Sequence, residues 1–376
     1  MPIAKVHRIS AAGPDDVSGL KAAIDTGRID PNGVMAVLGK TEGNGLVNDF
    51  SRGYASLALS LLFRDHLPPE RAGQICIVMS GGTEGGMAPH WVVFERAEAD
   101  AGAGGPALAI GRAQTPKLAF EHLGRLPQVE QVAAGVRSAM RAAAISDAAD
   151  VHYVQVKCPL LTAQRVAESE SRGASVAARE TLKSMGLSRA ASALGVAVAL
   201  GEIEHAKLRE ADIGANLALW SGCASASAGI ELEHHEIVVL GMSRAWSGPL
   251  AIDHALMTDA IDIEPVRAAL ARLGLAARGQ LPAVDRHRLV ALLGKAEASH
   301  DGRLRGRRHT MLDDSDISST RHARAFVCGA LAGLVGHAEI FISGGAEHQG
   351  PDGGGPVALI VDRGLASHTR TLASSP

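Results

Sequence analysis

The chain has 376 residues, a formal net charge of −3 and only 3% aromatic residues. This length allows about two to three domains of ~100–200 residues each, with a core built mostly from Ala, Val, Leu and Ile. No basic tract is present, so nucleic acid and acidic membrane partners are not indicated. No apolar run approaches ~20 residues and the N-terminus lacks an apolar signal core, so neither secretion nor membrane spanning is supported.

The four cysteines are scattered and form no CxxC pair. They are Cys76, Cys158, Cys223 and Cys328. This usage is typical of buried thiols in a reducing cytoplasm rather than of disulfides or a zinc site.

A pattern of six segments recurs three times along the chain. Each copy predicts a strand, a helix, a strand that ends in Lys, a small-residue helix that opens with Arg, a strand that ends in Ser, and a last strand. The first copy covers residues 4–9, 15–27, 34–42, 51–62, the run ending at Ser80, and 90–96. The second covers 107–113, 128–144, 151–159, 188–200, the run ending at Ser227, and 235–241. The third covers 250–256, 264–274, 289–297, 323–334, the run ending at Ser343, and 356–362.

The copies are separated by a Gly/Ala stretch at 100–107 and a loop at 243–249. We therefore predict three repeat units, residues 1–104, 105–248 and 249–376. The fold class is α/β, with helices covering one face of the strands. The polar segment 298–320 is expected to be a long loop. The pair His234-His235 lacks a HExxH partner and is expected on the surface.

Three landmark residue types keep the same order in every copy. The lysines are Lys40, Lys157 and Lys295, the arginines are Arg52, Arg189 and Arg324, and the serines are Ser80, Ser227 and Ser343. Each serine is followed by small residues and then by a glutamate, namely Glu84, Glu231 or Glu347. Three such corners indicate a site for a small polar ligand of near-threefold symmetry. The competing interpretation is that the repeats preserve structure alone, with the glycines permitting tight packing.

Serine becomes a strong nucleophile only when a base takes its proton. No His or Asp is placed regularly in the repeats, so a Ser–Lys arrangement is the natural interpretation. A lysine serves as a base when burial or nearby cations lower its pKa. Lys40 and Lys295 each have a glutamate two residues later, Glu42 and Glu297, on the same face of the strand. We expect these two lysines to be paired with the glutamates and to stay protonated.

Lys157 has no acid at the corresponding position, because Cys158 and Pro159 follow it. It is therefore our candidate for the neutral base, with Ser227 from the same repeat as the nucleophile. Ser80 and Ser343 are then expected to bind the substrate.

Six stretches carry a resemblance to a known family. They are GKTEGNGLVNDFSRGYAS, VMSGGTEGG, VQVKCPLLT, SRAASALGVAVALGEI, ASASAGIELEHHEIVVLG and SGGAEHQGPDGGGPVA. Over essentially its whole length the chain resembles the cyanuric acid amidohydrolase and barbiturase family. The resemblance implies three concatenated repeat units around a pseudo-threefold axis, an inner β-barrel with outer helices, and a cytoplasmic homotetramer. It also implies hydrolytic opening of cyanuric acid to carboxybiuret, which loses CO₂ to give biuret, without an organic cofactor.

The resemblance also assigns roles to individual residues. The family's nucleophile matches Ser227 and its activating lysine matches Lys157, with Lys40 and Lys295 in supporting positions. The substrate-binding positions match Arg52, Ser80, Gly81, Arg189, Ala228, Arg324, Ser343 and Gly344. A structural divalent cation, Mg²⁺ or Ca²⁺, is implied at Glu297, Ala346, Gln349, Gly350, Pro351 and Gly354. One carboxylate with carbonyl oxygens is a ligand set that suits a hard cation, and Glu297 would then serve the metal rather than Lys295.

Two alternative functions remain open at this point. The first is barbiturase activity, the opening of barbituric acid to ureidomalonate, and the choice is expected to depend on residues 319–324. The GKTEGN and SGGTEGG segments look closer to the cyanuric acid branch. The second is a catalytically silent ring-binding protein, against which the presence of both Lys157 and Ser227 argues.

Overall fold

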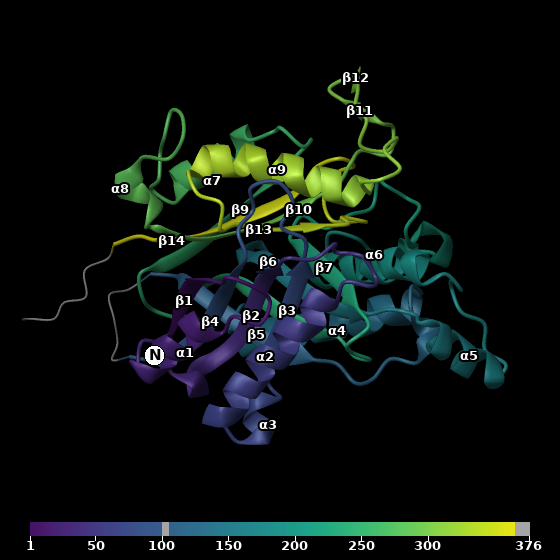
Figure 1. Ribbon diagram of the computed structural model, residues 1–376, viewed down its shortest axis with the longest axis horizontal. Helices are drawn as coiled ribbons and strands as arrows, with labels where there is room; N and C mark the ends of the chain where they lie inside the picture. Colours follow the sequence, from purple (N-terminus) through teal and green to yellow (C-terminus); the bar gives the residue numbers. More distant parts are fainter. Residues whose placement is uncertain (100–104, 365–376) are drawn as a thin grey trace, which may run out of the picture.

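The computed structural model describes residues 1–99 and 105–364 and contains three four-stranded sheets (Figure 1). The first has the order β1 (Pro2–Ser10), β4 (His90–Glu98), β2 (Val34–Thr41), β3 (Cys76–Gly81). The second has the order β5 (Ala107–Gln114), β8 (Glu236–Ser243), β6 (Val151–Pro159), β7 (Ala224–Gly229). The third has the order β9 (Leu250–Met257), β14 (Gly355–Asp362), β10 (Leu289–Ala296), β13 (Phe341–Gly344).

All three sheets share one topology. The first strand of each copy pairs antiparallel with the last, and the last pairs antiparallel with the Lys-bearing strand. The Lys-bearing strand pairs in parallel with the Ser-bearing strand. A parallel pair needs a crossover connection, and a long helix supplies it each time.

The helices occupy the positions that the repeat pattern predicts. The crossover helices are α2 (Phe50–His66), α6 (Thr181–Leu200) and α9 (Ser319–Val335). The helices after each first strand are α1 (Ser18–Asp25), α4 (Leu126–Ala142) and α7 (Glu264–Arg272). Shorter helices are α3 (Pro69–Ala72), α5 (Ala163–Ser171) and α8 (Ala283–Arg286). The helices α6 and α9 begin eight and five residues before Arg189 and Arg324, so neither helix opens with its arginine as expected.

The apolar core has a central part and outer parts. The central cluster joins residues from all three sheets, such as Leu38, Tyr153 and Phe341. An outer cluster packs α2 against the first sheet, with Leu59 and Phe63 beside Val93. In Figure 1, α7 and α9 likewise lie over the third sheet. The predicted α/β class is therefore confirmed, and the expected packing of helices on strands is seen for the first and third sheets.

Two finer expectations about the architecture stay predictions. Within the described residues the strand pairing gives separate sheets, with one isolated bridge between Ile3 and Ser247, so a closed inner barrel is not observed. The two boundaries between the three units fall in connections between strands, and residues 100–104 lie outside the described part of the chain.

One local expectation was incomplete and one was wrong. The polar segment 298–320 contains a small hairpin of β11 (Arg303–Leu304) and β12 (Arg307–Arg308). His235 is fully buried, and Thr115 and Gln128 lie within hydrogen-bonding distance of its two ring nitrogens, whereas His234 is partly exposed.

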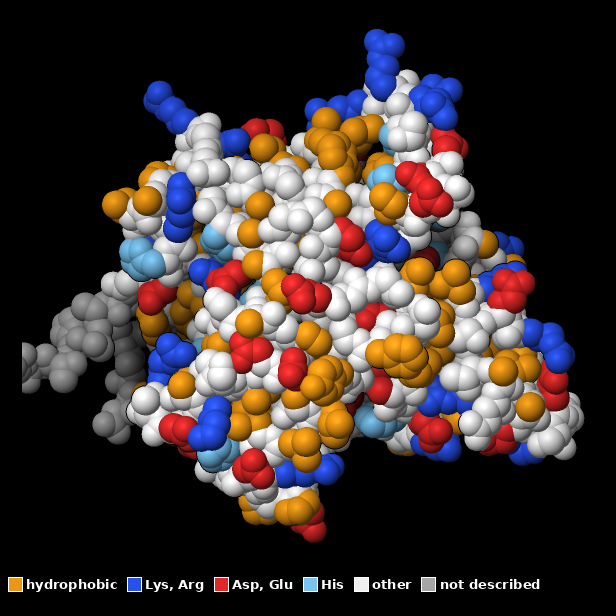
Figure 2. Space-filling view, in the orientation of Figure 1, with side chains coloured by type: hydrophobic (Ala, Val, Ile, Leu, Met, Phe, Trp, Pro, Cys, Tyr) orange, Lys and Arg blue, Asp and Glu red, His pale blue; other side chains and the backbone are white. Residues whose placement is uncertain are grey.

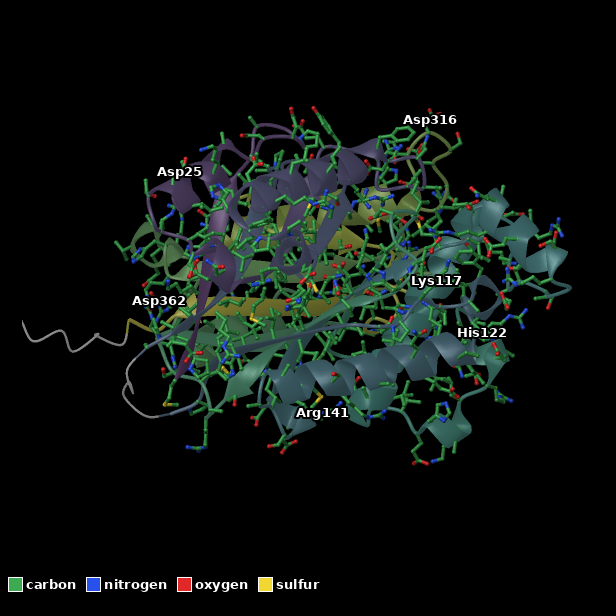
Figure 3. All side chains as sticks on the ribbon, turned by 90° about the horizontal axis from the view of Figure 1, so that it is seen from below. Asp25, Lys117, His122, Arg141, Asp316 and Asp362 are labelled. Carbon is green, nitrogen blue, oxygen red and sulfur yellow. The ribbon has the colours of Figure 1, made fainter. Side chains whose placement is uncertain are left out.

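The surface carries acidic and basic side chains mixed together over the face drawn in Figure 2. Seen from below, α4 lies along one margin of the molecule, with the exposed Arg141 near its C-terminal end (Figure 3). The four cysteines are buried and free, as expected. Among the described residues, no helix combines the length and apolar character needed to cross a membrane.

Candidate active site

The three serines and the three arginines of the repeats line one small pocket. Its lining residues are Gly45, Arg52, Met79, Ser80, Gly81, Met185, Arg189, Ser227, Ala228, Arg324, Ser343 and Gly344. All eight substrate-binding positions and the predicted nucleophile are in this set. Sequence reasoning missed Gly45, Met79 and Met185, of which Gly45 ends the GKTEGNG stretch that begins inside the first Lys-bearing strand.

Strand register brings each lysine next to its serine. In all three parallel strand pairs the lysine is the direct register partner of the serine: Lys40 with Ser80, Lys157 with Ser227, and Lys295 with Ser343. Register partners on neighbouring strands point to the same face of a sheet. Each lysine and serine that lie far apart in the sequence are thus neighbours on adjacent strands of the folded protein.

Two of these pairs are in direct contact. Nζ of Lys40 donates to Oγ of Ser80 at 3.1 Å. Nζ of Lys295 donates to Oγ of Ser343 at 3.3 Å and to the carbonyl oxygen of Ala226 at 3.0 Å. The expected pairing of these lysines with Glu42 and Glu297 is wrong, because no such ion pair occurs among the described residues.

Both contacting lysines are buried, and burial disfavours an ammonium ion. Burial, with a smaller effect of Arg324, holds the pKa of Lys40 well below its ordinary value. Burial, with a smaller effect of Arg189, lowers the pKa of Lys295 to about 7. The pKa of each of these two amines is therefore shifted in the direction that was expected for Lys157.

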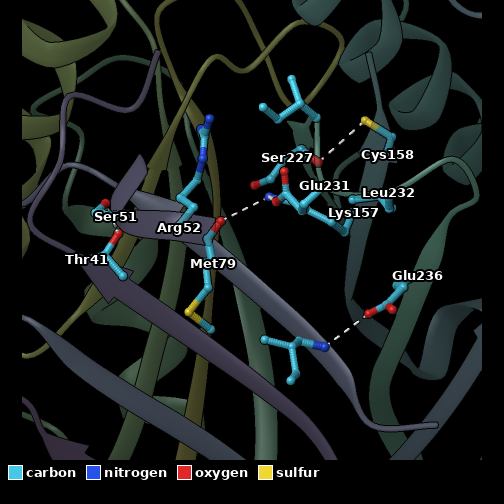
Figure 4. A network of polar contacts seen from close by, with 12 residues as sticks. Thr41, Ser51, Arg52, Met79, Lys157, Cys158, Ser227, Glu231, Leu232 and Glu236 are labelled. Carbon is cyan, nitrogen blue, oxygen red and sulfur yellow. Dashed lines mark hydrogen bonds and ion pairs between the residues drawn. The ribbon is translucent and has the colours of Figure 1, made fainter. Parts of the chain in front are cut away.

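Lys157 differs from its two counterparts. Its Nζ lies 2.8 Å from Oε1 of Glu231 and donates to the carbonyl oxygen of Met79 at 3.1 Å (Figure 4). The expectation that Lys157 has no acidic neighbour is therefore wrong. Glu231 was missed because it follows the Ser-bearing strand, whereas the search for an acidic partner covered only the strand of Lys157. Ser227 is instead 3.3 Å from Ser343, oxygen to oxygen.

The arginines are held by acids from neighbouring copies of the repeat. Nε of Arg324 donates to Glu84 at 2.8 Å, and Nε of Arg189 donates to Glu347 at 2.8 Å. Arg52 is the exception. Its guanidinium donates to the carbonyl oxygen of Leu46 at 2.7 Å, and its buried Nε has no hydrogen-bond partner within the described residues. Asp49 caps α2 through the amide of Ser51 and so fixes the start of the helix that carries Arg52.

The predicted cation ligands fit a divalent ion by their chemistry. The carboxylate of Glu297 has no hydrogen bond or ion pair among the described residues, and burial together with Glu347 raises its pKa to about 7. A partly buried, unpaired carboxylate is the kind of group that a cation stabilises. The side chain of Gln349 is already occupied, since Oε1 accepts from the amide of Ala226 at 2.6 Å. Gln349, Ala346, Gly350, Pro351 and Gly354 would therefore contribute backbone oxygens.

A second group of metal-ligand types is satisfied without an ion. His152 and His254 approach to 2.9 Å between their Nδ1 atoms, as one hydrogen bond. Asp253, the third member, accepts from Nε of Arg272 at 2.6 Å. Because Arg272 already neutralises the carboxylate, this group needs no cation.

The fold and the pocket define a class of protein. A model of a family described as amidohydrolase ring-opening protein matches residues 5–362, and the chain belongs to this family of ring-opening hydrolases. The resemblance seen in the sequence is thereby confirmed.

Particular relatives sharpen the comparison. A cyanuric acid amidohydrolase of Azorhizobium caulinodans is 65% identical over 363 residues, which is 96% of this chain and 99% of the relative. One of a Bradyrhizobium strain is 62% identical and covers 96% and 98%. The crystal structure of the cyanuric acid hydrolase from A. caulinodans matches with a TM-score of 0.91 at 64% identity, covering 97% of this chain and 100% of that one. A second cyanuric acid hydrolase structure, described as evolutionary innovation by structural concatenation, matches with a TM-score of 0.92 at 46% identity, covering 96% and 100%.

Proposed function

We propose that this protein hydrolyses cyanuric acid to carboxybiuret, which then loses CO₂ to give biuret. The observation that carries the proposal is the single pocket lined by three serines and three arginines, one of each from every repeat. Cyanuric acid repeats one amide unit three times around its ring, so each serine–arginine corner would meet one carbonyl group. The relatives that are named cyanuric acid amidohydrolase support the same substrate.

The proposed chemistry is nucleophilic catalysis by serine. Oγ of Ser227 attacks a ring carbonyl while its proton passes to Lys157, its register partner. The other serines and the backbone N–H groups after each serine stabilise the oxyanion. The ring C–N bond then breaks, and water releases the product from the acyl-serine. No organic cofactor is part of this scheme.

A competing assignment of the nucleophile has support in the geometry. Lys40 contacts Ser80 directly, and burial disfavours its charged form. Lys295 contacts Ser343 in the same way. Each pair could therefore supply a serine with a neutral amine beside it. We prefer Ser227 for two reasons. It is followed by an alanine, Ala228, whereas the other two serines are followed by glycine. Its lysine, Lys157, forms an ion pair with Glu231, which the other two lysines of the repeats do not have within the described residues.

One assay tests both the substrate and the nucleophile. The purified wild-type protein is given cyanuric acid or barbituric acid, and loss of each substrate is followed. We expect turnover of cyanuric acid and little of barbituric acid, whereas the reverse preference would identify a barbiturase and no loss of either would favour a ring-binding protein.

The same assay with serine variants tests the nucleophile. Among Ser227→Ala, Ser80→Ala and Ser343→Ala, the first should lose the most kcat. Near-normal turnover of Ser227→Ala with an inactive Ser80→Ala would transfer the nucleophile to Ser80.

The proposal extends to the metal, the assembly and the location. We propose a structural Mg²⁺ or Ca²⁺ at Glu297, supported by its unpaired carboxylate. We propose a homotetramer, supported by four apolar side chains on one exposed face of α2: Phe50, Tyr54, Leu57 and Leu61. A cytoplasmic location is supported by the four free thiols.

A further inference from the structure

A threefold pattern of arginine–glutamate pairs in this molecule is broken at one place. The arginine of the third repeat pairs with the glutamate of the first, and the arginine of the second repeat pairs with the glutamate of the third. Completion of the cycle would pair Arg52 of the first repeat with Glu231 of the second. Glu231 instead pairs with Lys157, and Arg52 keeps a buried Nε without a partner in the described part of the chain.

The backbone after the serine explains the break. Gly82 and Gly345, two residues after their serines, have φ of +99° and +72°. A Cβ atom at either position would clash with the guanidinium of the paired arginine, at 2.4 and 2.6 Å. Gly229, the equivalent residue, does not have a positive φ, and a Cβ there would meet the carboxylate of Glu231 at 2.0 Å. The glutamate carboxylate thus lies beside Gly229, within reach of Lys157.

The electrostatics of the pair agree with a functional contact. Burial alone would raise the pKa of Glu231, but the ammonium of Lys157 lowers it below its ordinary value. The Lys157 side chain is only 1% exposed and that of Glu231 is 26% exposed. A buried ammonium without such a partner would be costly.

We propose that Glu231 is the positioning residue that selects one of three equivalent Ser–Lys pairs for the chemistry. It orients the Lys157 amine and compensates its charge when that amine takes the proton of Ser227. The inference rests on the proposed function, which supplies the serine attack. The break in the cycle also leaves Arg52 without the carboxylate that holds each of the other two arginines, so its guanidinium is available to the ligand.

The proton balance of the step is closed. In the reacting form Lys157 is a neutral amine, its proton having left to solvent, and Glu231 is a carboxylate. The Ser227 O–H bond breaks as its oxygen bonds to the ring carbonyl carbon, and that proton goes to the amine. When the ring C–N bond breaks, the nitrogen takes this proton from Lys157. Lys157 is then a neutral amine again beside the Glu231 carboxylate, so no proton is gained or lost over the step.

The test compares Glu231→Gln with two matched variants, Glu84→Gln and Glu347→Gln. Gln cannot compensate an ammonium, so Glu231→Gln should lower kcat by about 100-fold or more with little change in KM. The matched variants release an arginine rather than a lysine, so they should act mainly by raising KM. Glu231→Asp, which keeps the carboxylate, should recover part of the lost kcat.

A second set of variants tests whether Glu231 acts through Lys157. The double variant Lys157→Met/Glu231→Gln should be no slower than Lys157→Met alone, because residues that act as one unit are not additive. Additive losses would overturn the inference, and so would equal kcat losses in the three glutamine variants. Absence of wild-type turnover on both ring substrates would overturn the proposed function and the inference with it. Circular dichroism and thermal unfolding of each variant identify those that fail to fold, and Glu231→Asp then carries the test.

Discussion

Arg189 and Glu347 lie 158 positions apart in the chain, in different repeats, yet they form a two-point ion pair, with Nε 2.8 Å from Oε2. The two side chains are 13% and 21% exposed. Since Arg189 lies on α6 and Glu347 follows β13, their contact fastens the second repeat to the third and fixes the guanidinium at the pocket.

Removal of one partner should therefore destabilise the fold. Arg189→Met leaves the Glu347 carboxylate buried and unpaired, which should lower the free energy of unfolding by about 3 kcal/mol. Urea unfolding measures this difference. The control is Lys21→Met, which breaks an exposed pair with Asp25 within α1 and should cost less than about 0.5 kcal/mol. Equal effects of the two substitutions would show that the Arg189 pair adds no stability.

Substitution of glycine by alanine should change the stability of the protein in opposite directions at two positions. A Cβ on Gly39 would lie 2.5 Å from the Trp91 ring, whereas one on Gly53, inside α2, meets nothing within 4 Å. Gly39→Ala should destabilise the protein by about 1–3 kcal/mol through overpacking. Gly53→Ala should stabilise it by about 0.5–1 kcal/mol, because Ala favours the helix. Thermal unfolding of the two variants tests the pair, and a stable Gly39→Ala would show that the strand beside Lys40 can shift.

A divalent cation should stabilise the folded chain through Glu297. After treatment with EDTA, addition of Mg²⁺ or Ca²⁺ at 100 times its Kd should add about 2.7 kcal/mol to the free energy of unfolding. Glu297→Gln should abolish this effect, while Glu70→Gln, an exposed residue on α3, should leave it intact. Stabilisation that persists in Glu297→Gln would place the cation elsewhere.

Stability at acidic pH should depend on His235. Burial lowers the pKa of His235 to about 3 from an ordinary value of 6.5. The unfolded chain therefore binds more protons between these two values, and stability should fall as the pH drops through this window. The slope from this residue is about 1.4 kcal/mol per pH unit. Urea unfolding from pH 7 to pH 4 should show that the difference in the free energy of unfolding between wild type and His235→Gln changes with this slope. A constant difference would contradict the prediction.

The exposed face of α2 should form a subunit contact. Phe50, Tyr54, Leu57 and Leu61 are spaced as one face of a helix and are each more than half exposed. The double substitution Leu57→Glu/Leu61→Glu should reduce the mass measured by light scattering after size-exclusion chromatography. Val284→Glu, at an exposed site on α8, serves as the control. An unchanged mass in the α2 variant would assign this face to another role.

The repeat architecture could be predicted because its signals are local. Strand periodicity and the punctuating glycines gave the order of elements in each copy, and the recurring Lys, Arg and Ser identified which side chains meet. Strand register matters here because a one-residue slip would turn every side chain of a strand to the opposite face of its sheet and separate the lysine from its serine. In the register observed, Lys40 and Ser80, separated by 40 positions, are direct partners.

The ion pairing at the site could not be predicted, because it depends on distances between copies. Sequence spacing alone predicts Glu42 as the partner of Lys40 and predicts no acidic partner for Lys157. The backbone after Ser227 turns differently from its two counterparts and brings Glu231 within 2.8 Å of Lys157. The sequence by itself determined the fold class, the family and the residues that gather at the pocket. Only the tertiary structure decided which charge compensates which, because Coulomb energy depends on the separation of charges in space and on their burial.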